Sequence, residues 1–155
     1  MERTVICRKS KKCIWEYIGG EIFLGMLFVI PVILAAALPV EESASYVRYI
    51  FAGIGVFFFL FFVAIIVSHV RFTRLPEVFL ERANTEFFHS NLDNSDLRIR
   101  SVDNIEVKIS KDKYGRAYSY GKLTFEVDGR LYVFKKVDNP EAAKQTITEI
   151  KQSLL

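Results

Sequence analysis

The stretch Tyr49–Val70, YIFAGIGVFFFLFFVAIIVSHV, decides the architecture of this chain. From Ile50 to Val67 it contains no charged residue, no amide side chain and no proline. An α-helix rises about 1.5 Å per residue, so about 20 such residues cross the hydrocarbon core of a bilayer. Six phenylalanines surround this helix, and a chain of 155 residues is too short to bury them on every side in a soluble core. The stretch therefore predicts a transmembrane helix.

A second apolar stretch precedes the first and predicts a helical hairpin. Ile22–Val40 carries no charge, and Pro31 near its middle is expected to kink the helix because proline lacks an N–H. Trp15 and Tyr17 at its start are residue types of the membrane interface. The polar residues Glu41–Tyr46 then predict a tight loop, which would make the two helices antiparallel neighbours.

The positive charges near the apolar stretches predict the orientation in the membrane. Five basic residues precede the first span: Arg3, Arg8, Lys9, Lys11 and Lys12. Two follow the second span, Arg71 and Arg74. The loop between the spans carries Glu41, Glu42 and only one basic residue, Arg48. Because positive loops stay in the cytoplasm, both termini are expected there, in a multi-pass protein of the cell (inner) membrane.

Composition divides the chain into three parts. Residues 1–13 are a basic cytoplasmic tail, and residues 14–74 form the transmembrane hairpin with spans at about 18–40 and 49–70. Residues 75–155 contain equal numbers of acidic and basic side chains and have the composition of a soluble domain. The spans are predicted as helices and the soluble part mainly as strands, so the predicted fold class is α+β.

Short alternating segments in the soluble part predict antiparallel strands. Val78–His89 reads as a hairpin that turns at Ala83-Asn84, and Leu97–Ile109 alternates apolar and charged residues with a break at Asp103-Asn104. Asp128-Gly129 suits a type I′ turn, which would place Phe125 opposite Tyr132 and Leu123 opposite Phe134.

A capped helix is expected to end the chain. Asn139 is a suitable N-cap, and Pro140 fits the first helical position because that position needs no N–H donor. An apolar stripe follows at helical spacing, so one face of the helix should pack on the sheet. The stripe consists of Ala143, Ile147, Ile150 and Leu154.

Ser110–Gly121 is predicted as a long loop and is the candidate contact site. It combines basic and aromatic side chains, which are enriched together at interfaces, and the basic Lys122 follows it. The alternative is a solvated loop without a partner. The candidate contact residues for a protein partner or for anionic lipid headgroups are Lys111, Lys113, Tyr114, Arg116, Tyr118, Tyr120 and Lys122.

The soluble part resembles a pleckstrin-homology-like (PH-like) fold, in which a curved antiparallel sheet or half-barrel is closed by a C-terminal helix. With two membrane helices in front, the chain resembles the bacterial PH-like membrane proteins. Four stretches carry this resemblance: Ile105–Ile109, the loop ending Tyr120-Gly121, the strand Lys122–Val127, and Val133–Glu141 leading into the last helix.

This resemblance implies a non-catalytic interaction or scaffold module at the inner leaflet, which supports envelope function or tolerance of membrane-active peptides through its assembly. Its partners would be the lipid bilayer and another protein or further copies of itself, with no nucleic acid and no cofactor or metal. No nucleophile–base pair or phosphate-binding loop is present in the sequence, so we expect no enzymatic activity.

A different class of function would use Glu21 and His69. Ionisable residues within membrane spans often mark proton or ion pathways, and His69 is the only candidate partner at a depth similar to that of Glu21. Two spans cannot enclose a pore, so the alternative function is a subunit of an oligomeric transport or conductance assembly. The competing interpretation of these two residues is an ordinary interfacial position for each.

Overall fold

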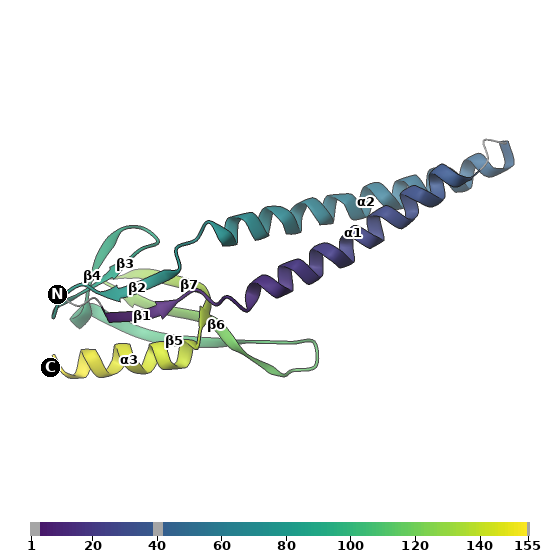
Figure 1. Cartoon of the computed structure of the whole chain (residues 1–155). Helices are drawn as coiled ribbons and strands as arrows, with labels where there is room; N and C mark the ends of the chain where they lie inside the picture. Colours follow the sequence, from purple (N-terminus) through teal and green to yellow (C-terminus); the bar gives the residue numbers. More distant parts are fainter. Residues whose placement is uncertain (1–3, 39–41, 155) are drawn as a thin grey trace. The chain divides into compact units, whose positions relative to one another are not determined.

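The computed structural model describes residues 4–38 and 42–154 (Figure 1). The chain divides into two compact units. One unit, here called the helical unit, comprises Cys13–Arg74. The other, the sheet unit, comprises the residues up to Lys12 together with those from Leu75 onward. The fold is α+β, as the sequence predicts.

The helical unit consists of α1 (Cys13–Ala37) and α2 (Glu42–Thr73), which pack side by side (Figure 1). Two helical segments are long and apolar enough to cross a membrane, Cys13–Ala37 and Tyr46–Thr73. Helix α1 continues through Pro31. Helix α2 already begins at Glu42, so the expected loop over Glu41–Tyr46 is wrong for all but Glu41, which lies outside the described residues.

Small residues allow close contact between α1 and α2. A Cβ atom placed on Gly55 would lie 2.9 Å from Cγ2 of Val32, so a larger residue would push the helices apart. The rings of Phe28 and Phe59 pack nearby, with centroids 5.2 Å apart. Gly55 is thus used within the hairpin, whereas Gly53 has open space beside it.

The first sheet of the sheet unit has the strand order β1-β2-β3-β4 and is antiparallel throughout. Its strands are β1 (Thr4–Arg8), β2 (Val78–Arg82), β3 (Phe87–Ser90) and β4 (Ser95–Arg98). The expected basic tail at residues 1–13 is therefore wrong for its central part, since Thr4–Arg8 pairs with Val78–Arg82 across an insertion that contains both long helices. Residues 1–3 lie outside the described residues.

The second sheet has the order β5-β6-β7 and is also antiparallel. A short 3₁₀ helix, η1 (Ile99–Ser101), leads into β5 (Val102–Lys111), which is followed by β6 (Ala117–Val127) and β7 (Arg130–Asp138). A bridge between Lys9 and Val137 joins this sheet to the end of β1. Ser10 N–H reinforces the junction by donating to the carbonyl of Lys136 at 2.9 Å.

Helix α3 (Pro140–Gln152) ends the chain and packs on β5, β6, β1 and η1. Asn139 is its N-cap and accepts a hydrogen bond from the N–H of Ala142, as predicted. The predicted apolar stripe faces the core, with Ala143 and Ile147 buried and Ile150 and Leu154 partly buried.

One apolar core holds both sheets and α3 together. Its largest fully buried side chains include Phe79, Phe88, Phe125 and Phe134. Ile6 and Cys7 from β1 belong to the same core. Burial in this apolar surrounding raises the pKa of the Cys7 thiol to about 12, because a thiolate there would lose its hydration. The N-terminal strand is thus a structural part of the sheet unit.

The strand predictions are correct where turn chemistry is explicit. Asp128 and Gly129 both have positive φ angles, as a type I′ turn requires, and Phe125 pairs with Tyr132 in the predicted register. The break predicted at Asp103-Asn104 is confirmed by a register shift between Asp103 and Glu106. The predicted strand through Ile99 is wrong, because β4 ends at Arg98 and η1 follows.

Candidate functional site

The predicted loop Ser110–Gly121 is in fact the end of a long hairpin. Strand β5 runs to Lys111 and β6 begins at Ala117, so only Asp112–Arg116 form the turn. Alternation in Ala117–Gly121 was hidden by its serine, glycine and tyrosine content, which is typical of loops. Of the candidate contact residues, Tyr118, Tyr120 and Lys122 therefore lie on a strand.

The carboxylate of Asp112 organises the hairpin tip, here defined as residues 112–116. Its Oδ1 accepts hydrogen bonds from the backbone N–H groups of Tyr114 and Arg116, both at 2.8 Å. Gly115 has a φ of 80°, a conformation that favours glycine. The acid that interrupts the basic run is thus the residue that fixes the turn.

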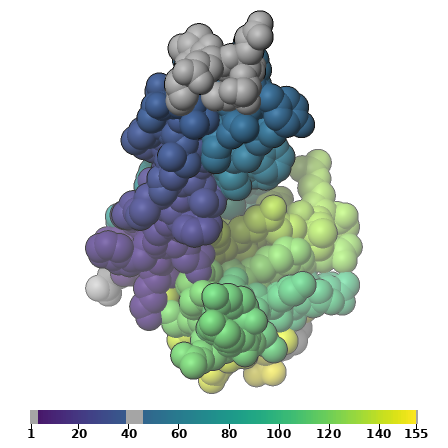
Figure 2. All heavy atoms as spheres, turned by 90° about the vertical axis from the view of Figure 1, so that its right-hand side faces the viewer, coloured from purple at the N-terminus to yellow at the C-terminus, as the bar shows by residue number. Residues whose placement is uncertain are grey.

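The tip presents one aromatic ring with two cationic groups close to it. Tyr114 is 72% exposed. Lys113 Nζ lies 4.9 Å from the centroid of the Tyr114 ring, and the guanidinium carbon of Arg116 lies 6.0 Å from it. These distances suit cation–π contacts, which hold the ring and both charges together. In Figure 2 the tip, in green, projects toward the viewer from the sheet unit.

The other two tyrosines of the candidate site have different environments. The rings of Tyr118 and Tyr120 stack with centroids 5.0 Å apart. Tyr118 is exposed, but Tyr120 is only 3% exposed and belongs to the interior. Tyr120 therefore cannot meet a partner without unfolding of the strand, and its predicted contact role is wrong.

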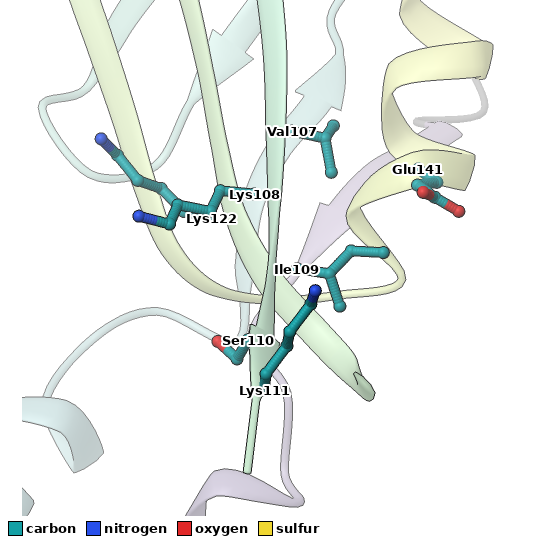
Figure 3. Close-up of a pocket in the computed structure, with 7 residues that line it drawn as sticks. All are labelled: Val107, Lys108, Ile109, Ser110, Lys111, Lys122 and Glu141. Atoms are coloured by element: carbon teal, nitrogen blue, oxygen red, sulfur yellow. The ribbon is translucent and has the colours of Figure 1, made fainter. Parts of the chain in front are cut away.

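A groove of about 730 Å³ runs along β5 beside the start of α3 (Figure 3). Val107 and Ile109 point to the side of α3, where Glu141 lies, whereas Lys108 and Lys122 point to the opposite side of the strands. Lys108 and Lys122 are directly opposite each other in the β5–β6 register. Like charges in such a pair repel, so this part of the surface favours an anionic neighbour.

Replacement of Asp112 by alanine should loosen the hairpin tip without unfolding the sheet unit. Two hydrogen bonds to a charged acceptor would be lost from an exposed turn, and we expect a local cost of about 1 kcal/mol. Amide hydrogen exchange at Tyr114 and Arg116 measures this opening directly. Asp112→Asn is the matched control because it keeps an acceptor oxygen. Equal exchange rates in Asp112→Ala and the parent chain would contradict the assigned role.

The helical unit contains a second candidate site. His69 Nδ1 of α2 and Glu21 Oε1 of α1 lie 2.7 Å apart, within hydrogen-bond distance. Their side chains are 21% and 25% exposed. The structure therefore brings together the two residues that the sequence singles out as a pair.

Tyr17 and Phe72 complete this cluster, and their part in it is not among the predictions from the sequence. The Tyr17 ring stacks on the His69 ring with a centroid distance of 5.2 Å and an interplanar angle of 1°. Phe72 packs on Tyr17 at 5.5 Å. The available signal was spacing: Tyr17 and Glu21 are four residues apart on one helix, and His69 and Phe72 are three apart on the other. The Tyr17 ring and the Glu21 carboxylate together fix the position of the His69 imidazole.

The remaining titratable clusters are small. His89 Nδ1 lies 2.8 Å from Asp96 Oδ1, across the β3–β4 pair. Cys7 and Cys13 are both buried, and neither belongs to a disulfide. Within the described part of the chain, no group of three or more histidine, cysteine or acidic side chains is placed to hold a metal ion.

Comparisons with known proteins do not assign this chain to a family. No protein-family model, curated protein sequence or solved structure matches it.

Proposed function

We propose that this chain is a membrane-anchored, non-catalytic interaction module of PH-like fold at the inner leaflet of a bacterial cell membrane. In this proposal the helical unit anchors the chain and the sheet unit binds a protein partner. An effect on envelope function or on tolerance of membrane-active peptides would arise through that assembly. The observation that carries the proposal is the hydrogen-bonded tip of the β5–β6 hairpin, where the exposed Tyr114 ring lies close to the charges of Lys113 and Arg116.

The order of elements supports a PH-like fold. A four-stranded antiparallel sheet is followed in the chain by a three-stranded antiparallel sheet and then by one amphipathic helix, and this helix packs on both sheets. The element order of a PH-like fold is the same. Here the first strand precedes the long helices and the other six follow them.

The pairing of β1 with β2 supports a hairpin that begins and ends on the same side of a membrane. Strand β1 ends before α1 begins, and β2 follows α2. Because the two strands are hydrogen-bonded to each other, helices that cross a bilayer between them must cross it an even number of times. The basic residues beside the helices favour the cytoplasmic side for both termini.

The hairpin tip has the properties of a protein contact. Tyrosine and arginine are enriched at the centres of protein interfaces, and tyrosine loses little conformational entropy there. The two backbone hydrogen bonds to Asp112 order the turn before binding, which lowers the entropic cost of association. A complementary partner would supply an acidic or aromatic surface.

A photo-crosslinking amino acid at Tyr114 tests this function in native membranes. We expect one dominant crosslinked protein, identified by mass spectrometry, whose yield falls by about tenfold when Lys113 and Arg116 are both replaced by serine. The matched control is the same crosslinker at Leu131, which is 66% exposed beside the β6–β7 turn.

Two results would contradict the proposed function. In the first, the probe at Tyr114 captures only lipid, which would make the tip a headgroup contact. In the second, probes at Tyr114 and Leu131 give the same set of products, which would mean that the tip meets proteins only by chance.

The contact between Glu21 and His69 favours a second candidate function, a subunit of an oligomeric transport or conductance assembly. The distance of 2.7 Å and the stacked Tyr17 ring form a proton-binding arrangement between two apolar helices. Because two helices cannot surround a pathway, several copies would have to contribute their hairpins.

A flux measurement separates the two candidate functions. If the chain conducts protons, Glu21→Gln in purified protein reconstituted into vesicles should abolish a proton flux that Glu16→Gln leaves unchanged. His69→Gln should do the same while the oligomeric state stays intact. Loss of cellular function in Glu21→Gln with unchanged crosslinking from Tyr114 would favour transport. An unchanged phenotype in both variants would favour the interaction module.

A further inference from the structure

Strand β5 leaves the longest open edge in the sheet unit. It pairs with β6 on one side, and no strand among the described residues pairs with its other side. At the start of β5, Lys151 Nζ donates to the carbonyl of Val102 and forms an ion pair with Asp103 at 2.7 Å. These contacts cover the first two residues, so the open edge runs over Asn104–Lys111.

An open edge presents unpaired N–H and C=O groups that can bind a further strand. In the first sheet, β4 is the edge strand farthest from β1. It is poorly suited to bind a further strand because it has only four residues and exposes Asp96 and Arg98. The edge of β5 is longer and lies beside the groove described above. An added strand would therefore bind more readily along β5 than along β4.

The charges of β5 fit a second copy of the same strand. Glu106 lies in its first half and Lys108 in its second half, and both side chains are exposed. When two copies pair antiparallel around a two-fold axis at Val107, each Glu106 lies opposite Lys108 of the second copy. This charge pair forms twice, once on each side of the axis.

The same register matches the apolar side chains. Ile105 lies opposite Ile109 of the second copy, and Val107 lies opposite its own equivalent. In Figure 3, Val107 and Ile109 point to the α3 side of the strand, away from Lys108. Apolar residues would thus meet on one face of the extended sheet and opposite charges on the other.

Neighbouring registers are unfavourable. An axis at Glu106 places two glutamates opposite each other, and an axis at Lys108 places two lysines opposite each other. An axis between two residues brings side chains from opposite faces into one pair. The axis at Val107 avoids all of these conflicts.

Pairing of two copies would also stabilise the contact between β5 and β6. Lys108 and Lys122 lie directly opposite each other, and neither forms an ion pair with a described carboxylate. Glu106 of the second copy would add a negative charge beside Lys108 and reduce the repulsion between the two lysines.

We propose that the sheet units of two copies associate through antiparallel pairing of their β5 edges, centred on Val107. This inference rests on the proposed function, because it names a second copy as a partner of the interaction module. The interface is two-fold symmetric and closed, so it gives a dimer and leaves the hairpin tip accessible at residues 112–116. Anchoring both copies in one membrane would raise their effective concentration.

A cysteine at the two-fold axis tests the geometry. Residues opposite each other in an antiparallel pair have Cα atoms about 4.5–5.5 Å apart, which suits a disulfide. The full chain with Val107→Cys should form a covalent dimer in oxidised native membranes. The parent chain, whose two cysteines are buried, and the exposed Leu131→Cys variant should stay monomeric on a non-reducing gel. Absence of the Val107→Cys dimer would overturn the proposal.

Charge reversal tests the register. In the Val107→Cys chain, Glu106→Lys or Lys108→Glu alone should lower the dimer yield by about tenfold or more, because like charges then face each other. The double variant Glu106→Lys with Lys108→Glu should restore it, because the pairs are opposite in charge again. Lys135→Glu on β7 is the control and should change nothing.

Two outcomes would contradict the proposed pairing. If Lys108→Glu lowers the yield but the double variant does not restore it, Glu106 does not pair with Lys108 of the second copy and the register centred on Val107 is wrong. A missing Val107→Cys dimer together with intact crosslinking from Tyr114 would overturn this inference and leave the proposed function standing.

Discussion

A chain that begins at Leu75 should fail to fold, although it contains almost the whole sheet unit. Six of its strands and α3 would be present, but β1 would be missing. Without β1, the edge of β2 is open, and the contacts of Lys9 with Glu77 and Val137 that join the two sheets are lost. The expected product is an aggregating or molten chain with no cooperative thermal transition.

The size of the effect follows from what β1 contributes. Ile6 and Cys7 are 8% and 2% exposed within the shared core, and full burial of an aliphatic side chain contributes about 1.5–3 kcal/mol. The backbone pairing with β2 adds about 0.5–1.5 kcal/mol per hydrogen bond. The sum is comparable with the total stability of a small domain, about 5–15 kcal/mol. Loss of one short strand should therefore remove most of the stability of the sheet unit.

The decisive comparison is with a chain in which residues 1–12 are joined to Leu75–Leu155 by a short Gly/Ser linker. Lys9 Nζ donates to the carbonyl of Leu75 at 2.7 Å, so the two ends are close enough for such a linker. The joined chain should melt cooperatively by circular dichroism, whereas Leu75–Leu155 alone should not. Equal melting curves for the two chains would show that β1 is dispensable.

Alkylation of Cys7 gives an independent measure of the same folding. Only the thiolate reacts, and burial raises the pKa of Cys7 from an ordinary value of 9.0 to about 12. Since the folded state favours the neutral thiol, the burial of Cys7 contributes stability below pH 9, and this contribution is lost as the pH rises from about 9 toward 12. At pH 8, in a Cys13→Ser background, alkylation should follow unfolding.

The N-terminal strand shows why a local sequence pattern can mislead. Only three apolar residues, Val5, Ile6 and Cys7, stand between polar and basic neighbours, and their strand partner lies beyond both long helices. Positive charge before a predicted membrane span is also expected from the positive-inside bias, so the basic residues were interpreted as a tail although Thr4, Val5 and Ile6 are β-branched. By contrast, the Asp128-Gly129 turn and the Asn139 cap are local features, and both were predicted correctly.

In the candidate sites, too, features that depend on local sequence were predicted, and features that depend on contacts between distant residues were not. The exposed tip at Lys113–Arg116 followed from composition alone, because polar and glycine residues favour turns. The burial of Tyr120 depends on the β6–β7 register and on the core beneath it, which a single sequence does not specify. The contact of Glu21 with His69 depends on how two helices are rotated against each other, which hydropathy alone does not determine.

Gly121→Val should strongly destabilise the β5–β6 hairpin. A Cβ atom on Gly121 would lie 2.9 Å from Cα of Ile109 and would also clash with the carbonyl oxygen of Lys108. Both neighbours are backbone atoms of the paired strand, so no side chain can rotate away. The strands must separate at this position, and we expect a loss of about 3 kcal/mol or more, at the upper end for overpacking.

Gly129→Ala is the matched control for this substitution. Gly129 has a φ of 76°, but a Cβ atom there meets nothing within 4 Å. Its replacement should cost only the conformational strain, about 1 kcal/mol. Both variants can be compared in the full chain through the urea dependence of Cys7 alkylation in the Cys13→Ser background. A midpoint for Gly121→Val equal to that for Gly129→Ala would show that β5 and β6 can move apart freely. Such freedom would also remove the fixed edge on which pairing through Val107 depends.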